Sequence, residues 1–237
     1  MIKKEELGVG NLIILQDENG YRFTSDAVIL ANFVSAKKTD IVVEFCLGSG
    51  IISTLICYKQ NPKHIYGFEI QKNVYDLANQ SLKQNNLQDK ITYLHEDLKE
   101  FDKHIQKLSA DIVVCNPPYK KISDGLLPEK EEIAISKTEL KITLEEIILA
   151  TKSVLKDGGK FYVCYEPSRL VELIYLLKQN KLEPKRMFFS HAKVESAPSC
   201  VFVECIKGAR SELKLLPPLI THNDTGDYVA IIRNMFI

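Results

Sequence analysis

Short apolar runs alternate with amphipathic segments along residues 41–179, and this alternation restricts the fold more than any other feature of the chain. The apolar runs predict strands at 41–45, 65–69, 91–94, 112–115 and 160–164. The amphipathic segments predict helices at 51–58, 74–85, 144–155 and 170–179. Strands that alternate with helices form a parallel sheet, because each right-handed crossover places a helix on one face.

The end of the sheet departs from that pattern. Strands are predicted at 186–190 and 199–206 with no helix between them, so we expect one of the two to run antiparallel. Asp157-Gly-Gly159 is expected to end the helix before the strand at 160–164. The sequence therefore predicts an α/β fold with a seven-stranded, mostly parallel sheet, one antiparallel strand and helices on both faces.

Residues 1–40 are expected to form an extension to the sheet core at 41–237. A hairpin is predicted at 11–24, because Asn19-Gly20 lies between two apolar runs and favours a tight turn. One of Thr24, Ser25 and Asp26 is expected to cap a helix that continues to Val34. With 237 residues, 45% of them hydrophobic, the chain is long enough for one large domain.

Composition excludes several classes of function. Lys+Arg and Asp+Glu both number 31, so any surface that binds nucleic acid must be a local basic patch. No apolar run approaches the roughly 20 residues of a membrane-spanning helix, and the N-terminus does not resemble a signal peptide. The six cysteines form no Cys-x-x-Cys pair and the five histidines have no metal-binding spacing. These patterns predict reduced thiols, no metal and a cytoplasmic location.

The stretch Asp111-Ile-Val-Val-Cys-Asn-Pro-Pro-Tyr119 carries the most specific chemistry. Its apolar run predicts a buried strand that stops at Asn116, because two prolines cannot continue a ladder of hydrogen bonds. The carboxyl ends of strands are where open α/β sheets bind ligands. The side chain of Asn116, the rigid Pro117 and Pro118 and the ring of Tyr119 are expected there, and together they suit a planar group with an NH2. Asn-Pro-Pro-Tyr resembles the motif of methyltransferases that act on an exocyclic or amide nitrogen.

A glycine turn follows the first strand of the sheet core. Glu44-Phe-Cys-Leu-Gly48-Ser-Gly50 leads directly into a helix, so its backbone can approach a ligand closely. A dinucleotide fingerprint would need a third glycine where Ser53 stands. The spacing is instead similar to the acidic-x-Gly-x-Gly-x-Gly motif of S-adenosylmethionine enzymes, with Cys46 in the place of the first glycine.

Acidic residues follow the next two strands as well. Glu69 ends the second strand, where a carboxylate can accept both hydroxyls of a ribose. Asp97 follows the third strand and can accept from an exocyclic amine, with Leu98 or Ile70 against the adenine ring. Three acids that follow three successive strands predict a site for S-adenosylmethionine.

Stretches along almost the whole chain resemble the bacterial tRNA(Val) adenine-N6-methyltransferase family. They are Phe23-Thr-Ser-Asp-Ala-Val-Ile-Leu30, Glu69-Ile-Gln71, Asn116-Pro-Pro-Tyr119, Leu155-Lys-Asp-Gly-Gly-Lys-Phe161, Arg169-Leu-Val171, Leu182-Glu-Pro-Lys-Arg186, Val203-Glu-Cys-Ile-Lys-Gly208 and Leu213-Lys-Leu-Leu-Pro-Pro-Leu219. The chain departs from the family at Cys46, at Lys137-Thr138 and at Tyr165-Glu166.

The resemblance implies a Rossmann-like class I methyltransferase fold and N6-methylation of the adenine 3′ of the anticodon. It implies that Asp26 and Asn116 join Glu44, Glu69 and Asp97 in binding the cofactor. The N6 lone pair is delocalised into the ring, so the Asn116 side chain and the Pro117 carbonyl are expected to accept its two hydrogens and localise it. Tyr119 is expected to stack on the base.

Contacts with tRNA are expected from basic residues beside the target pocket and in the last third of the chain. Lys120 and Lys121 follow the motif directly, and Arg186 belongs to a more distant set. That set comprises Lys178, Lys181, Lys185, Arg186, Lys193, Lys207, Arg210 and Lys214. The polar segment 120–141 is either a lid over the site or a surface loop.

Two other functions remain open from the sequence. A protein glutamine N5-methyltransferase would use the same pocket for an amide, although such enzymes carry a sizeable helical domain before the first strand and about 40 residues precede Ile41 here. A catalytically silent module that binds RNA or the cofactor would not need the intact Asn116-to-Tyr119 motif.

Overall fold

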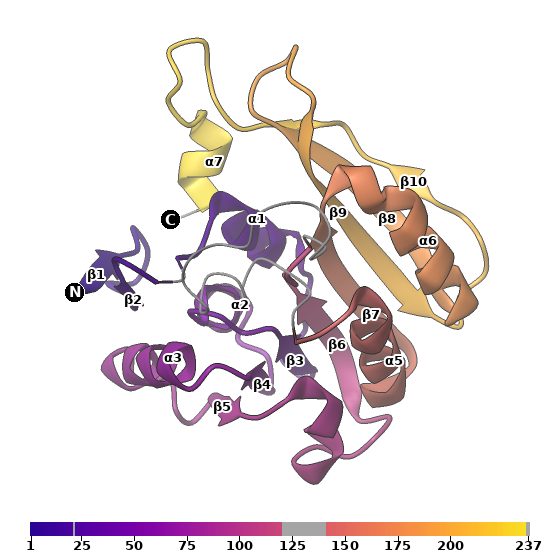
Figure 1. The fold of residues 1–237 in the computed structure, drawn as a ribbon, viewed down its shortest axis with the longest axis horizontal. Coiled ribbons are helices and arrows are strands. Elements are labelled where there is room, and N and C mark those ends of the chain that lie inside the picture. Colours follow the sequence, from indigo (N-terminus) through magenta and orange to yellow (C-terminus); the bar gives the residue numbers. More distant parts are fainter. Residues whose placement is uncertain (21, 120–140, 236–237) are drawn as a thin grey trace.

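A central sheet organises the structure, a computed structural model that describes residues 1–20, 22–119 and 141–235. The strand order is β10-β8-β9-β7-β6-β3-β4-β5, with β11 beside β8 (Figure 1). The seven longer strands are β3 (Ile41–Phe45), β4 (His64–Glu69), β5 (Ile91–His95), β6 (Ala110–Cys115), β7 (Leu155–Tyr165), β8 (Leu182–His191) and β9 (Pro198–Lys207). Strand β9 pairs antiparallel with both β7 and β8, so it is the reversed strand of an otherwise parallel sheet. The predicted fold is confirmed.

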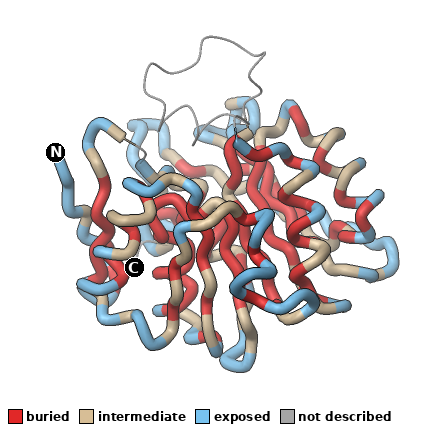
Figure 2. Tube along the Cα trace, turned by 60° about the horizontal axis from the view of Figure 1, so that its bottom comes forward, coloured by how far each residue is buried: buried red, intermediate tan, exposed pale blue. Residues whose placement is uncertain are grey.

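Helices cover both faces of the sheet and enclose two hydrophobic cores. One core lies under α1 (Ser25–Phe33), α2 (Ile51–Gln60) and α3 (Lys72–Gln84). The other lies under α5 (Leu144–Val154), α6 (Leu170–Gln179) and the short 3-10 helix η1 (Leu98–Lys103). Buried residues therefore run along the strands, and exposed residues gather at the ends of the elements (Figure 2). No helix in the described residues is long and apolar enough to cross a membrane.

The N-terminal hairpin differs from the prediction. Strand β2 (Ile13–Asp17) pairs with the preceding β1 (Ile2–Glu6) and does not pair with residues after the turn at 18–20. The sequence of β1 shows no apolar pattern because the strand is almost wholly exposed, with Glu5 alone half-buried among its residues. Side chains of α3 hold β2 in place: Ser81 Oγ accepts from the backbone N–H of Leu15 at 2.8 Å, and Asn85 Oδ1 accepts from that of Ile13 at 2.9 Å.

The end of α5 also differs from the prediction. The helix ends at Val154, and Gly158 and Gly159 lie within β7, where the pairing with β6 is irregular. The Nζ of Lys207 donates to the carbonyl oxygens of Lys152 and Leu155, both at 2.8 Å, and thereby satisfies the last turn of α5. A lysine from a neighbouring strand thus does what the glycines were expected to do.

The C-terminal segment adds two short strands that the sequence did not predict. Strands β10 (Lys214–Leu215) and β11 (Leu219–Ile220) both pair parallel with β8. Pro217 and Pro218 separate them, because proline offers no N–H to a ladder. The chain then returns to α1, against which α7 (Ala230–Met235) packs (Figure 1).

Two glycines with the same backbone conformation predict different costs of substitution. Gly50 and Gly158 both have φ of +76°, but a Cβ at Gly50 would lie 2.5 Å from the hydroxyl oxygen of buried Tyr93, whereas a Cβ at Gly158 would meet nothing within 4 Å. We expect Gly158→Ala to lower the free energy of unfolding by about 1–2 kcal/mol. Gly50→Ala should lower it by roughly 1–3 kcal/mol more, because Tyr93 must move. Equal losses in urea unfolding would show that the contact with Tyr93 does not matter.

Candidate functional site

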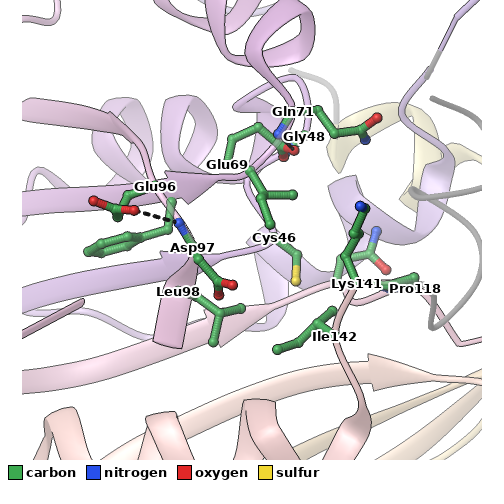
Figure 3. Close-up of a pocket in the computed structure, with 13 residues that line it drawn as sticks. Cys46, Gly48, Glu69, Gln71, Glu96, Asp97, Leu98, Pro118, Lys141 and Ile142 are labelled. Atoms are coloured by element: carbon green, nitrogen blue, oxygen red, sulfur yellow. Dashed lines mark hydrogen bonds between the residues drawn. The ribbon is translucent and has the colours of Figure 1, made fainter. Parts of the chain in front are cut away.

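A pocket lies at the carboxyl ends of β3, β4, β5 and β6. It holds about 580 Å³ of empty space, part of which is open to solvent. Its lining combines carboxylates with apolar side chains, as expected of a site for a small molecule (Figure 3). The lining residues are Cys46, Gly48, Phe68, Glu69, Ile70, Gln71, Glu96, Asp97, Leu98, Asn116, Pro118, Lys141 and Ile142.

The turn between β3 and α2 forms one wall of the pocket. Cys46 has φ of +56° and Gly48 has φ of +58°, so the backbone is left-handed at both positions. Cys46 therefore takes a conformation that usually belongs to glycine, as the predicted motif requires at this place. Its half-buried side chain lines the pocket. Gly50 lies at the N-terminus of α2 and is not among the lining residues.

Glu44 lies behind this turn and does not line the pocket. Its carboxyl is fully buried, and Oε2 accepts from both the backbone N–H, at 2.9 Å, and the hydroxyl of Ser53. Ser53 stands where a dinucleotide motif would have its third glycine. Its two hydrogen bonds to Glu44 connect α2 to the end of β3. Burial raises the pKa of Glu44 to about 8, and the two hydrogen bonds from Ser53 oppose that shift.

Glu69 connects the turns that follow β3 and β4. Its Oε2 accepts from the backbone N–H of Gly48 at 2.8 Å, and its Oε1 accepts from that of Gln71 at 3.0 Å. Burial raises the pKa of Glu69, while these backbone donors act in the opposite direction. A carboxylate offers about four lone-pair sites, so each oxygen keeps capacity for another donor in the pocket.

Asp97 begins η1 on the opposite side of the pocket. Its Oδ1 accepts from the backbone N–H of Lys99 at 2.9 Å, and Oδ2 lies 3.4 Å from Lys99 Nζ. Apolar side chains lie nearby, with Leu98 and Ile142 largely buried and Ile70 exposed over 40% of its surface. Figure 3 shows Asp97, Leu98 and Ile142 around one common space with Glu69 and Cys46. The arrangement suits a flat ring with a polar edge.

Asn116 lies directly after β6, and its side chain is part of the pocket lining. Its Oδ1 accepts a hydrogen bond from the Sγ of Cys164 on β7 at 3.0 Å. Pro117 and Pro118 are both buried, and Pro118 lines the pocket. The amide is therefore held at the edge of the pocket by a rigid backbone on one side and by a thiol on the other.

Tyr119 completes the motif and is half-buried outside the pocket lining. Its carbonyl oxygen accepts from Nη1 of Arg169 at 2.8 Å, and its ring meets the edge of Tyr165 at 6.2 Å between centroids. Arg169 also pairs with both carboxylate oxygens of Glu172. Burial, followed by the nearby charge of Asp26, raises the pKa of Tyr119. Asp26 thus lies beside the motif, although it does not line the pocket.

Several residues expected to bind substrate lie elsewhere. Arg186 Nε donates to buried Glu204 at 2.6 Å and its guanidinium lies over the ring of Phe33 at 4.8 Å, so this cation is engaged within the fold. Lys178, Lys181 and Lys185 flank the start of β8, at the edge of the sheet opposite the pocket. Lys193 follows the end of β8 on the pocket side. Lys120, Lys121, Lys137 and the proposed lid fall outside the described residues, apart from Lys141.

Some pocket residues escaped the sequence analysis. Phe68 and Glu96 were hidden within or beside a predicted strand, and Lys141 and Ile142 follow the long segment at 120–140 with no recognisable motif. Cys164 and Arg169 hold the Asn116-to-Tyr119 motif through hydrogen bonds that only the sheet order reveals, because β7 lies next to β6. In the described part of the chain, no group of three or more potential ligands could hold a metal ion.

Comparisons with known proteins agree with this geometry. The sequence profile of the methyltransferase small domain family matches residues 24–179. A tRNA1(Val) (adenine(37)-N6)-methyltransferase of Dyadobacter fermentans is 27% identical over 163 residues, which are 67% of this chain and 65% of that protein. A protein of the same name from Bacteroides fragilis is 18% identical over 226 residues, 94% of both chains. A release factor glutamine methyltransferase of Clostridium botulinum is 30% identical over 133 residues, 53% of this chain and 47% of that protein.

The fold also occurs among solved structures. A predicted O-methyltransferase of Agrobacterium tumefaciens superposes with a TM-score of 0.71 and 17% identity, over 89% of this chain and 94% of that one. At this identity the similarity concerns the fold.

The raised pKa of Glu44 predicts a dependence of stability on pH. Because the folded state holds the proton up to about pH 8 and the ordinary pKa is 4.5, the contribution of Glu44 to stability should be complete below the lower value and lost as pH rises through the upper one. The Gln side chain of Glu44→Gln cannot ionise. As pH rises over this range, the free energy of unfolding of the variant should therefore increase relative to that of the wild type. Denaturant unfolding at several pH values measures the difference, with exposed Glu145→Gln as the control. Parallel pH curves for wild type and Glu44→Gln would contradict the assignment.

Proposed function

The chain belongs to the methyltransferase small domain family, and we propose that it transfers a methyl group from S-adenosylmethionine to N6 of an adenine in tRNA. The observation that carries the proposal is that Asn116 and Pro118 line the same pocket as Glu69 and Asp97. Asn116, which can accept from the amine of the substrate, thus lies in the same pocket as Glu69 and Asp97, which can accept from the nucleoside of the cofactor. Methyl transfer between two bound molecules requires such proximity.

The pocket has the chemistry to hold S-adenosylmethionine. Both oxygens of Glu69 keep acceptor capacity for the ribose hydroxyls after binding the Gly48 and Gln71 N–H groups. Asp97 can accept from the exocyclic amine of the adenine, and the ring would pack against Ile70 and Leu98. The left-handed turn at Cys46 and Gly48 leaves the backbone beside the pocket open to the methionine portion.

S-adenosylmethionine supplies, when bound, a methyl group on a positively charged sulfur. The side-chain oxygen of Asn116 and the carbonyl of Pro117 would each accept one N6–H of the target adenine. These bonds shift the nitrogen towards tetrahedral geometry and concentrate its lone pair for attack, with little reorganisation because both prolines are rigid. Since the donor is already cationic, the adenine needs no strong base, and the released proton can pass to solvent. Tyr119 would stack on the base from outside the pocket lining.

The target that we propose is the adenine 3′ of the anticodon of tRNA(Val). Two of the relatives are named for N6-methylation of adenine 37 in tRNA1(Val). A base in a single-stranded loop leaves its stack at less cost than a base in a duplex. A second candidate is the amide nitrogen of a protein glutamine, because the Clostridium botulinum relative carries that name. The match to that relative covers 47% of its length, against 94% for the tRNA enzyme of Bacteroides fragilis.

Labelled S-adenosylmethionine separates the two substrates. The protein is incubated with total tRNA in one sample and with bacterial release factors in another, and the labelled nucleosides of the RNA are then identified. We expect N6-methyladenosine in a valine tRNA and no label in the release factor. Label in the protein only would replace the proposal with glutamine methylation.

Asn116→Ala should lower turnover without changing cofactor affinity or thermal stability appreciably. Loss of one preorganised acceptor costs about 3–4 kcal/mol in the transition state, or about 100- to 1000-fold in kcat. Single-turnover methylation, titration calorimetry and a melting curve give the three values. Asn180→Ala is the control, because it removes a hydrogen bond to the Leu176 carbonyl at the opposite edge and should reduce stability alone. Near-normal turnover of Asn116→Ala would refute a catalytic role.

RNA binding should depend on salt and on basic residues at the pocket edge of the sheet. Lys141 is exposed and lines the pocket, whereas Lys181 lies at the opposite edge. Lys141→Gln should weaken tRNA binding and reduce the slope of log affinity against log salt by about 0.7–1, because one phosphate contact is lost. Lys181→Gln should leave both unchanged. An equal effect of the two substitutions would place the RNA on a different surface.

A further inference from the structure

Cys164 lies beside the Asn116 amide because β7 is the neighbour of β6 in the sheet. Cys115, the last residue of β6, pairs with Val163 of β7, and the residues that follow them are Asn116 and Cys164. Cys164 has no exposed surface, and its Sγ lies 3.0 Å from Asn116 Oδ1. The thiol therefore reaches the amide from the neighbouring strand, and the same Asn116 lines the pocket.

The direction of this hydrogen bond follows from the chemistry of the two groups. An amide oxygen has two lone pairs and no hydrogen, so the thiol must donate. Burial raises the pKa of the Cys164 thiol well above its ordinary value. The sulfur thus keeps its hydrogen at neutral pH and remains a donor.

We propose that Cys164 is a positioning residue for Asn116: its thiol occupies one lone pair of the amide oxygen and directs the other towards the substrate amine. The role rests on the proposed methylation of an amine in this pocket. If the amide were flipped, its NH2 group would take the place of the oxygen and would face the incoming amine as a second donor. The sulfur could then act only as a weak acceptor for that NH2 group. The thiol therefore selects the orientation in which Asn116 accepts.

Three cysteine variants test the role. Cys164→Val keeps a similar volume in a strand and removes the donor, Cys164→Ser keeps a donor on a shorter bond, and Cys205→Val is the control at a buried thiol of β9. We expect Cys164→Val to lower kcat about fivefold, the change that corresponds to one hydrogen bond of about 1 kcal/mol. KM for tRNA and Kd for S-adenosylmethionine should stay within about twofold. Cys164→Ser should recover part of kcat, and Cys205→Val should match the wild type.

An infrared measurement tests the hydrogen bond from the Cys164 thiol to Asn116 even if Cys164→Val does not fold. The S–H stretching band of Cys164 is identified by difference from Cys164→Ser. It should move to higher frequency in Asn116→Ala, because the thiol loses its acceptor. An unmoved band, or a Cys164→Val enzyme with the kcat of the wild type, would overturn the inference while leaving the proposed function intact. Wild-type protein that methylates no RNA would instead refute the proposed function, and this role with it.

Discussion

The carboxylate of Glu69 is the interaction on which the pocket depends. It accepts from backbone N–H groups of two different turns, at Gly48 after β3 and at Gln71 after β4. Because the two turns belong to neighbouring strands, one buried side chain fixes the distance between them. Glu44, which is fully buried behind the first of these turns, connects β3 to the N-terminal turn of α2 by accepting from the backbone N–H of Ser53. The ligand-facing backbone is thus supported by acids whose burial is offset by hydrogen bonds.

Several basic side chains make contacts that hold the fold together. Two basic residues that resemble family features, Arg186 and Lys207, contact Glu204 and the end of α5 respectively. Arg169 holds the backbone of Tyr119 and pairs with Glu172. Among the described residues, Lys141 is an exposed cation at the pocket edge, and Lys193, which donates to the Asp224 carbonyl, lies at the same end of the sheet. In a chain with no net charge, such a local group is what a surface for a polyanion can draw on.

The sequence predicted the sheet core well, because hydrophobic periodicity and the residues at strand ends are local properties. The strand at 41–45 and the helix at 170–179 were predicted with their observed bounds. Errors arose where distant segments decide the structure: β2 pairs with the charged β1, and Lys207 ends α5. The same limit applies to the site. Glu69 and Asp97 could be placed by their strands, whereas the bond from Cys164 requires knowledge of which strands are neighbours.

The short strands near the C-terminus affect how much of the sheet edge is open to other molecules. Without them, the side of the ten-residue strand β8 that faces away from β9 would present its backbone groups unpaired. Strands β10 and β11 occupy parts of that row with two residues each, and the Pro217-Pro218 pair between them has no N–H to offer a further strand. A sheet edge covered in this way offers another chain a shorter template for pairing than a bare strand does. The described C-terminal residues thus do not line the pocket but shorten the free edge of the sheet.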